Sequence, residues 1–396
     1  MNMTAKKRIA IIGAGVAGMA FAILAARQGH FVHVFERRPQ TGSELGAGVT
    51  LWPNASFVLK QMGLLDEIAK VSGKPKSMVR YDQHSSDPLN QAFSEKSRLA
   101  IHDINRQAQN ETYSILRRDL MAILFDALQK TQAHIHFSHP VQAEALAQLK
   151  TEYDLVIGAD GRMNSAARQN ITSALSAESS VDNEAVYQGF INVIGISQSP
   201  FTLVDKTVIQ DYWGDGERFG IVPIDDQTCY WAAGWVSLPK RKSHPFFTQK
   251  DLMHRFQHWP KPVIDVLQHA QGASINTIYV HDVNPITSWH NDNVLLIGDA
   301  AHAALPTSGQ GACQALEDAW TLAQLLPEHD DIDVVLQQFQ AKRIDKTTAI
   351  QRTGRHIAQT IFHTKPSDRA VDGSISQTPS HAIANFWMSG LIPSNV

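Results

Sequence analysis

The amino-acid sequence predicts an α/β protein with a Rossmann-like dinucleotide-binding domain, an inserted α+β domain that contains an antiparallel sheet, and further helices near the C-terminal end. Residues 8–36 have the pattern of a βαβ unit with a glycine-rich turn. Two later apolar strands, at 154–157 and 294–297, each run into a glycine and an aspartate, as expected at the ligand-binding edge of an open parallel sheet. Between them, from about residue 181, β segments alternate with turn residues and indicate an inserted sheet.

The βαβ unit contains the most specific local motif. Ile9 to Ile12 form an unbroken apolar run, typical of a strand buried on both faces. The spacing G-x-G-x-x-G follows, with Gly13, Gly15 and Gly18. In order, these glycines permit a tight turn, a close approach of a pyrophosphate, and close packing of helix on strand. A second strand ends at Glu36, where a carboxylate can receive ribose hydroxyls. The motif alone does not separate NAD from FAD, and a phosphate-free α/β core is the weaker alternative.

Composition excludes several other classes of protein. The net charge of −3 argues against a nucleic-acid partner. Lys6, Lys7 and Arg8 precede an apolar run as in a signal peptide, but three glycines interrupt that run, and no other segment approaches the ~18 apolar residues of a membrane span. The two cysteines lack C-x-x-C spacing, which fits a reducing, cytoplasmic location and gives no zinc site. The scattered histidines suggest no metal ligands either.

Elements before the insertion follow from periodicity and caps. A helix should run from about Trp52 to Met62 and stop at Gly63. Residues 73–97 show little periodicity beyond a short strand, 77–81, and are expected to leave the first domain. A helix should follow Arg117, another strand should cover 134–141, and the spacer 142–153 has little room for a hairpin.

The expected elements of the insertion are β segments followed by helices, and after the insertion the chain returns to the first sheet. Four β segments are expected, at 186–194, 206–212, 218–223 and 229–236, and helices near 248–258 and 262–268 follow them. The strand at 294–297 then returns to the first sheet and precedes a glycine-rich loop and a helix from Ala312. The tail from Phe339 should be helical, with Gly354 and several prolines as breaks.

Three motifs in order are more specific than any one of them. They are GAGVAG at 13–18 with Glu36, IGADGR at 157–162, and IGDAAHAALPTSGQGACQALEDA at 297–319. Together, from about residue 8 to about 355, they resemble the single-component FAD-dependent monooxygenases of the aromatic-hydroxylase class, whose FAD-binding domain is of the GR2 type. GAGVTLWPNA at 46–55 and HDVNP at 281–285 are most similar to the branch of urate hydroxylase and zeaxanthin epoxidase.

The resemblance implies a set of FAD-binding residues. Glu36 would bind the adenosine ribose, Arg37 would lie by the adenine, and Asp299 would bind the ribityl and pyrophosphate region. The amides of Gly311 and Ala312 would face the flavin pyrimidine ring, where a helix N-terminus stabilises negative charge. The full implied set is Gly13, Gly15, Val16, Ala17, Gly18, Glu36, Arg37, Gly48, Arg117, Val141, Asp160, Asp299, Pro306, Gly309, Gly311 and Ala312. Asp160 would serve both FAD and NAD(P)H. Cys313 stands where many relatives have Asn, and we expect a small buried residue there.

The resemblance also implies a reaction. NAD(P)H, with NADPH expected rather than NADH, would reduce FAD, and O₂ would form a C4a-hydroperoxide that hydroxylates or epoxidises a small aromatic or heterocyclic substrate. Arg218 and Tyr230 match the pair that holds and activates substrate in urate hydroxylases, and Arg218 would favour an anionic substrate. The alternatives are that Arg218 belongs to a strand pattern widespread in the class and that Tyr230 only packs.

The expected domains are discontinuous. The FAD-binding domain would comprise 1–72, 98–180 and 281–345, the substrate domain 73–97 and 181–280, and a C-terminal helical region 346–396. Other activities on this fold are an FAD-dependent dehydrogenase or halogenase, although the W-x-W-x-I-P motif of tryptophan-type halogenases is absent. A non-catalytic flavin scaffold is the third alternative, and the intact motifs argue against it. A monomer or homodimer is expected.

Overall fold

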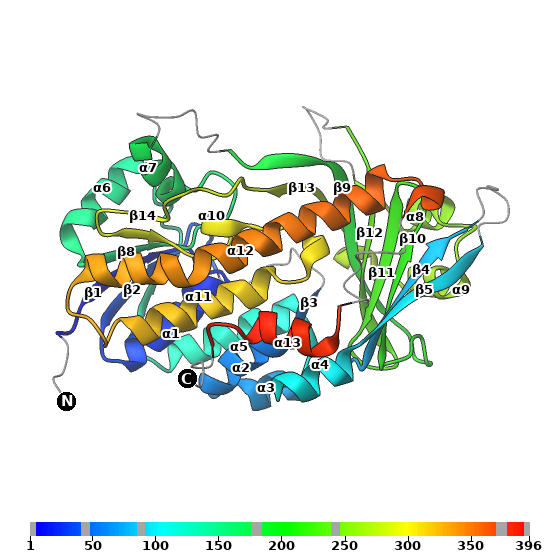
Figure 1. Ribbon diagram of the computed structural model, residues 1–396, viewed down its shortest axis with the longest axis horizontal. Coiled ribbons are helices and arrows are strands. Elements are labelled where there is room, and N and C mark those ends of the chain that lie inside the picture. The colour runs from blue at the N-terminus through cyan, green and yellow to red at the C-terminus, as the bar shows by residue number, and fades with distance from the viewer. Residues whose placement is uncertain are drawn as a thin grey trace.

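Two sheets lie side by side in an elongated molecule, and one long helix extends along both (Figure 1). The computed structural model describes residues 5–40, 48–84, 92–175, 184–238, 246–369 and 378–391. Gly46 and Ala47 of the predicted GAGVTLWPNA motif, and parts of the predicted domain segments, lie outside the described residues. Within the described residues, no helix is both long enough and apolar enough to cross a membrane.

The first sheet has six strands in the order β14-β15-β8-β1-β2-β7. Their bounds are β1 (Arg8–Ile12), β2 (Phe31–Phe35), β7 (His134–His136), β8 (Leu155–Gly158), β14 (His290–Asn291) and β15 (Val294–Leu296). All neighbours pair in parallel except β14 with β15. The central strands are almost wholly buried, which confirms the apolar runs predicted at 9–12, 154–157 and 294–297.

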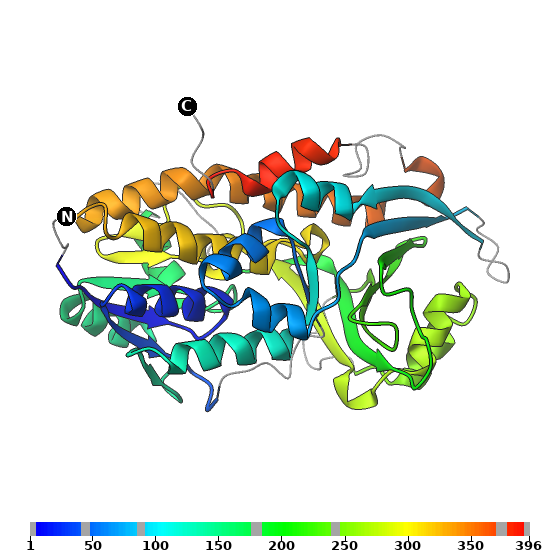
Figure 2. The same cartoon turned by 90° about the horizontal axis from the view of Figure 1, so that it is seen from below.

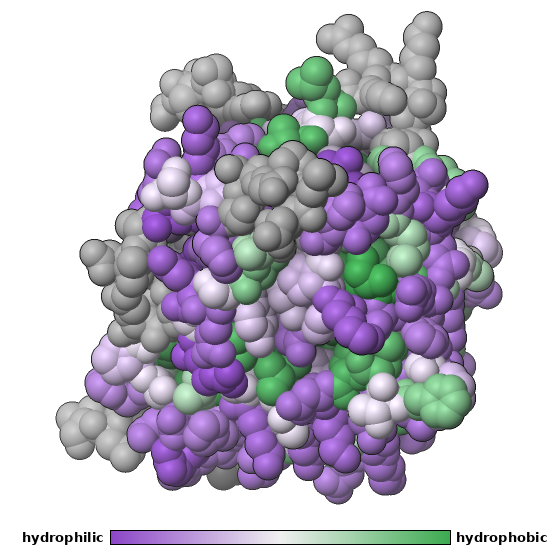
Figure 3. Space-filling model, turned by 90° about the vertical axis from the view of Figure 1, so that its right-hand side faces the viewer, coloured by the Kyte–Doolittle hydropathy of each residue, from purple (hydrophilic) through white to green (hydrophobic). Residues whose placement is uncertain are grey.

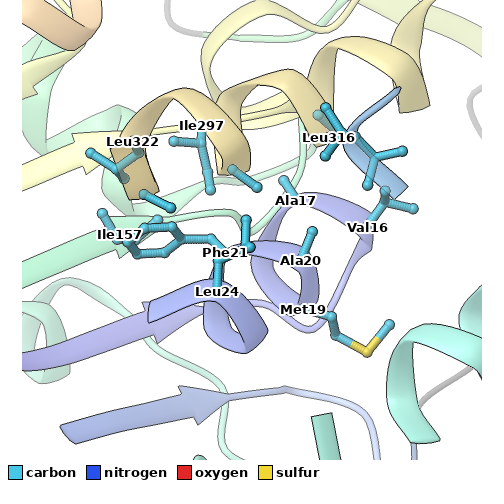
Figure 4. Close-up of a cluster of buried hydrophobic side chains, with 14 of the residues drawn as sticks. Val16, Ala17, Met19, Ala20, Phe21, Leu24, Ile157, Ile297, Leu316 and Leu322 are labelled. Carbon is cyan, nitrogen blue, oxygen red and sulfur yellow. The ribbon is translucent and has the colours of Figure 1, made fainter. Parts of the chain in front are cut away.

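Helices α1 (Val16–Arg27) and α11 (Gly311–Leu325) pack on this sheet and on each other. Figure 4 shows Phe21 of α1 near Ile157 of β8, with Leu316 and Leu322 of α11 beside the same cluster. At Gly18 the helix lies too close to the glycine-rich turn for any side chain, because a Cβ there would lie 2.0 Å from the carbonyl oxygen of Gly13. Apolar burial here holds the glycine-rich turn at the edge of the sheet.

The second sheet has seven strands in the order β13-β9-β12-β11-β10-β4-β5. Their bounds are β4 (Ser77–Gln83), β5 (Phe93–Ala100), β9 (Val186–Gln198), β10 (Val208–Trp213), β11 (Glu217–Pro223), β12 (Thr228–Val236) and β13 (Asn276–Asp282). The sheet is antiparallel, as predicted, apart from the parallel pair β4–β10. Helices α8 (Gln249–Arg255) and α9 (Lys261–Gln268) cover one face, where their apolar residues pack on Phe219 and Trp231.

The opposite face of this sheet points away from α8 and α9, because successive side chains on a strand point to opposite faces. Residues such as Gly220, Tyr230 and Ala232 alternate with the packed residues along β11 and β12 and line a large cavity. The outer surface at this end of the molecule is mostly hydrophilic with separate apolar patches (Figure 3).

The remaining elements connect the two sheets. They are β3 (Gly48–Leu51), β6 (Tyr113–Leu116), α2 (Pro53–Gln61), α3 (Leu65–Lys70), α4 (Ile101–Ala108), α5 (Arg117–Gln129), α6 (Ala143–Glu152), α7 (Ala166–Leu175), α10 (Asp299–His302), α12 (Ile332–His363), α13 (Ser380–Met388) and short 3₁₀ turns at Gly272–Ser274, Pro306–Ser308 and Pro366–Asp368. Helix α2 ends as predicted, with Gly63 at φ +69°. Helix α13 packs on α4 and α2 (Figure 2).

Several predicted elements were wrong in their extent. The predicted strand 134–141 ends at His136, and the following residues form a loop. The spacer 142–153, by contrast, contains no hairpin, in agreement with the prediction, and forms the helix α6. Gly354 does not break the tail, because α12 continues through it as one helix and its packed face stabilises the glycine there. The predicted domain boundary between 345 and 346 therefore falls inside α12.

Candidate active site

One large cavity of about 1530 Å³ is lined by residues from both sheets. This volume exceeds the ~300–1,000 Å³ of ordinary small-molecule pockets, so it has room for a large cofactor together with a second molecule. Every site residue predicted from the sequence lines this cavity except Gly18. Gly18 instead lies buried against the carbonyl of Gly13, which agrees with its predicted packing role.

The glycine-rich turn has the geometry that a pyrophosphate requires. Gly13 has φ +101°, and a Cβ there would lie 2.4 Å from the carbonyl oxygen of Ala159. Above Gly15, by contrast, no atom lies within 4 Å of the position a Cβ would take. The turn is thus closed toward the sheet and open toward the cavity, and the N-terminus of α1 behind it favours an anion.

Glu36 lies at the end of β2, and two backbone amides hold its carboxylate. The amide of Ala14 donates to Oε2 at 2.8 Å, and the amide of Arg38 donates to Oε1 at 2.9 Å. A carboxylate has about four lone-pair sites, so two can still accept from ribose hydroxyls. Arg37 and Val141 line the cavity beside it, Val141 from the loop after β7.

Asp299, the first residue of α10, faces basic side chains across the cavity. Arg162 donates from Nη1 to Asp299 Oδ2 at 3.2 Å. Burial lowers the pKa of the nearby Arg117, while Asp299 raises it, and Arg38 and Arg162 lower it further. Sequence reasoning did not assign a role to Arg162, although it closes the IGADGR motif.

Asp160 is held by its own loop. Ser165 Oγ donates to Oδ1 at 2.6 Å, and the amide of Ala167 lies 3.5 Å from Oδ2. Burial raises the pKa of Asp160, and these hydrogen bonds oppose that shift. Its carboxylate thus secures the turn into α7 and shapes the cavity wall.

The N-terminus of α11 opens into the cavity at Gly311 and Ala312. No side chain caps this terminus, and no atom lies within 4 Å of a Cβ position on Gly311, so its amides can meet a ligand. The preceding loop is held by Trp52, whose Nε1 donates to the carbonyl of Gly309 at 3.1 Å. Trp387 of α13 packs on Trp52 with ring centroids 4.6 Å apart and also lines the cavity.

Cys313 is fully buried, as expected, with Sγ 3.6 Å from the carbonyl oxygen of Thr50. Burial raises the pKa of its thiol to about 12, so the thiol stays neutral at ordinary pH.

Beneath this loop, a buried ionic network joins α11 to α12 and α13. Arg343 donates from Nε to Asp318 Oδ1 at 2.7 Å and from Nη1 to Glu317 Oε2 at 2.6 Å. Lys346 donates to Glu317 and to the carbonyl oxygen of Trp387 at 2.6 Å. His302 Nε2 lies 2.6 Å from Asp318 Oδ2. The network therefore fixes α13 beside the N-terminal turn of α11.

This network predicts a loss of stability in acid. Burial alone would raise the pKa of Asp318, but His302 and Arg343 outweigh it and lower the pKa from 3.8 to about 2. A depressed pKa contributes stability that is present above the unfolded value and is lost as the pH falls through the folded value. We expect the free energy of unfolding, measured in urea, to fall from about pH 4 to about pH 2, and to fall less steeply in Asp318→Asn. Equal pH slopes for the two proteins would contradict this assignment.

At the other end of the cavity, the sheet face carries two ion pairs. Arg80 forms a fork with Asp82, with Nε and Nη2 at 2.6 and 2.5 Å from the two carboxylate oxygens. Arg218 donates from Nε to Asp211 Oδ1 at 2.6 Å. Trp213 lies between the pairs, because Arg80 stacks on its ring at 3.6 Å and its Nε1 donates to Asp211 at 2.8 Å.

Sequence reasoning found Arg218 but missed Arg80, Asp211 and Trp213. The sequence did contain a signal for these residues. They alternate with apolar residues along β4 and β10, and such alternation indicates a strand with one polar face. Tyr230 also lines the cavity, and its hydroxyl lies 2.9 Å from Thr50 Oγ1. Burial raises the pKa of Tyr230, which keeps the phenol protonated. Among the described residues, no group of His, Cys, Asp and Glu side chains is arranged to hold a metal ion.

The fold and the cavity together place this chain in the class of dinucleotide-binding α/β proteins that have a second sheet facing the cofactor cavity. A sequence model described as an FAD binding domain matches residues 6–350, and the chain belongs to this family. The open turn, the anchored Glu36 and the uncapped α11 terminus fit such a cofactor.

Similar proteins support the same placement. The chain is 27% identical over 359 residues to aurachin C monooxygenase/isomerase of Stigmatella aurantiaca, covering 89% of this chain and 88% of that protein. It is 25% identical over 350 residues to the FAD-dependent urate hydroxylase of Mycolicibacterium vanbaalenii, covering 86% and 85%. The structure of Klebsiella pneumoniae HpxO complexed with FAD and uric acid has the same fold, with a TM-score of 0.74 at 22% identity over 92% of this chain and 91% of that one. The predicted resemblance to FAD-dependent monooxygenases is confirmed.

Proposed function

We propose that this protein is an FAD- and NAD(P)H-dependent monooxygenase that hydroxylates or epoxidises a small aromatic or heterocyclic substrate. The observation that carries the proposal is a single cavity that joins a dinucleotide turn, an uncapped helix N-terminus and a polar sheet face. The names of the relatives, monooxygenase and urate hydroxylase, support the reaction type. The predicted division into FAD-binding and substrate domains forms part of the proposal.

The chain's own residues would bind and orient. Gly13 and Gly15 would receive the pyrophosphate, Glu36 the ribose, and Asp299 with Arg162 the middle of the cofactor. The amides of Gly311 and Ala312 would stabilise negative charge at the end nearest the second sheet. Bound FAD supplies the redox and oxygen chemistry, while the apolar and aromatic walls exclude water around the substrate.

Arg218 and Tyr230 would position the substrate against the cofactor. Both line the cavity from the second sheet, and Tyr230 also meets Gly48, where a Cβ would lie 2.1 Å from its ring. The protonated phenol can donate a hydrogen bond to a ring substituent. Cys229 and Cys313 are buried and free, which supports a reducing location such as the cytoplasm.

The test is turnover by purified protein with isotopically labelled O₂. We expect about one FAD per chain, substrate-stimulated oxidation of NADPH above that of NADH, and one labelled oxygen atom in the product. A panel of phenols, hydroxypyridines and quinolones serves as substrates. An oxidised product without labelled oxygen would indicate a dehydrogenase, and a halide requirement would indicate a halogenase. Flavin that NAD(P)H cannot reduce would indicate a scaffold, and each of these results contradicts the proposal.

A further inference from the structure

The strand register places the two ion pairs in two adjacent rows on the cavity face of the second sheet. Arg80 of β4 is the partner of Asp211 on β10, and Trp213 is the partner of Asp82 on one side and of Arg218 on the other. Directly paired residues point to the same face of a sheet. One row is therefore Arg80, Asp211 and Gly220, and the adjacent row is Asp82, Trp213 and Arg218. Each guanidinium is bound to a carboxylate of the other row.

Each charge in these two rows is already compensated. Asp211 is 2% exposed and accepts from both Arg218 and Trp213, while Arg80 is bound by both oxygens of Asp82. Among the described residues, the other carboxylates and guanidinium groups lining the cavity lie on the loops of the six-stranded sheet or at the start of α5. Three histidines also line the cavity: His139, in the loop after β7, and His281 and His356. Among the described residues, the second sheet thus presents two neutralised pairs to the cavity, and both of its guanidinium groups there have a carboxylate partner.

The Arg218–Asp211 pair borders an open position above Gly220. The site of a Cβ on Gly220 would lie 3.5 Å from Asp211 Oδ1 and 3.6 Å from Arg218 Nη2. Gly220 and its strand partner Ala232 are small, so a flat ring can lie on this part of the sheet. The edge of such a ring would meet a donor and an acceptor next to each other.

We propose, building on the function proposed above, that the substrate is an uncharged ring with an amide-type edge of adjacent N–H and C=O groups, and that Asp211 determines this preference. A carboxylate placed beside Arg218 would also face Asp211, whose negative charge offsets the attraction at short range. A neutral N–H and C=O edge can use the carboxylate and the guanidinium together. Asp211 thus reverses the anion preference expected from Arg218 alone.

The test compares isosteric probes that differ in charge: benzamide with benzoate, salicylamide with salicylate, and nicotinamide with nicotinate. Their dissociation constants come from perturbation of the flavin absorbance of the FAD-loaded protein. We expect each amide to bind at least about tenfold more tightly than its carboxylate, the difference that one compensated charge can make. Equal or tighter binding of the carboxylates would overturn the inference while leaving the proposed monooxygenase intact. Protein that holds FAD but binds no member of any pair would also overturn the inference, while the turnover test decides the proposed function separately.

Two single variants should shift this preference in opposite directions. Asp211→Asn leaves the Arg218 charge uncompensated and should shift the amide-to-carboxylate ratio about tenfold toward carboxylates. Arg218→Gln leaves Asp211 uncompensated and should shift the ratio further toward amides. The double variant restores a neutral site and should return toward the wild-type ratio. Asp265→Asn, which breaks an exposed pair with Lys261 on α9, is the control for overall charge and should leave the ratio unchanged. If the ratio does not move in either single variant, Asp211 has no such role.

Discussion

Gly15→Val should lose FAD binding by about a hundredfold or more while the apoprotein keeps its fold. Gly15 has an extended backbone, φ −80° and ψ −172°, which valine adopts freely, and no protein atom lies within 4 Å of its Cβ position. The added side chain therefore meets only the space that a pyrophosphate would use. Titration of apoprotein with FAD, followed by flavin absorbance, measures the loss, and circular dichroism of the apoprotein checks the fold.

Gly18→Ala is the matched variant in the same motif, and it should reduce the stability of the fold. Its Cβ would lie 2.0 Å from the Gly13 carbonyl oxygen, so α1 must move away from the strand. We expect a loss of about 3 kcal/mol in the free energy of unfolding, seen as a lower urea midpoint. If Gly15→Val unfolds the apoprotein, or if Gly18→Ala keeps full stability, the two glycines do not have the separate roles assigned to them.

Arg343→Met should destabilise the protein by about 3–5 kcal/mol, because it leaves two wholly buried carboxylates, Glu317 and Asp318, without their shared guanidinium. Methionine fills much of the space, so the expected loss comes from two buried carboxylates that keep only Lys346 and His302 as ion-pair partners among the described residues. Urea unfolding of the apoprotein measures it without the stabilising effect of bound FAD.

Arg98→Met is the matched control for that substitution. Arg98 also pairs with a carboxylate, Glu95, but both side chains are nearly half exposed. Exposed pairs of this kind contribute roughly 0–1 kcal/mol, so the control should remain near wild-type stability. Similar losses of unfolding free energy in the two variants would show that the Arg343 network stabilises the protein no more than an exposed ion pair does.

The parallel sheet was predictable because its strands are buried on both faces and appear as continuous apolar runs. The second sheet was predictable where turn residues separate the strands. Strand β5 was missed because its residues 94–96 are polar and exposed, so that its sequence resembles a loop. Gly354 was misinterpreted because helix propensity is a weak guide inside α12, where tertiary packing decides.

The cofactor end of the site was predictable to a greater extent than the substrate end. A pyrophosphate requires glycines at fixed spacing, and such spacing is visible in the sequence. The substrate end depends instead on which residues lie opposite one another across strands far apart in sequence. Arg80 and Asp211 are neighbours only through the parallel pairing of β4 with β10, a topology that no local pattern specifies.

The cavity wall includes residues from nearly the whole length of the chain, from the turn at Gly13 to Trp387 on α13. During synthesis, the N-terminal turn leaves the ribosome long before Trp387 is made. The loop at Gly309 lacks the support of the Trp52–Trp387 stack until then. A nascent chain can therefore form its first strands and helix early, but its complete cofactor pocket is assembled only after translation has passed α13.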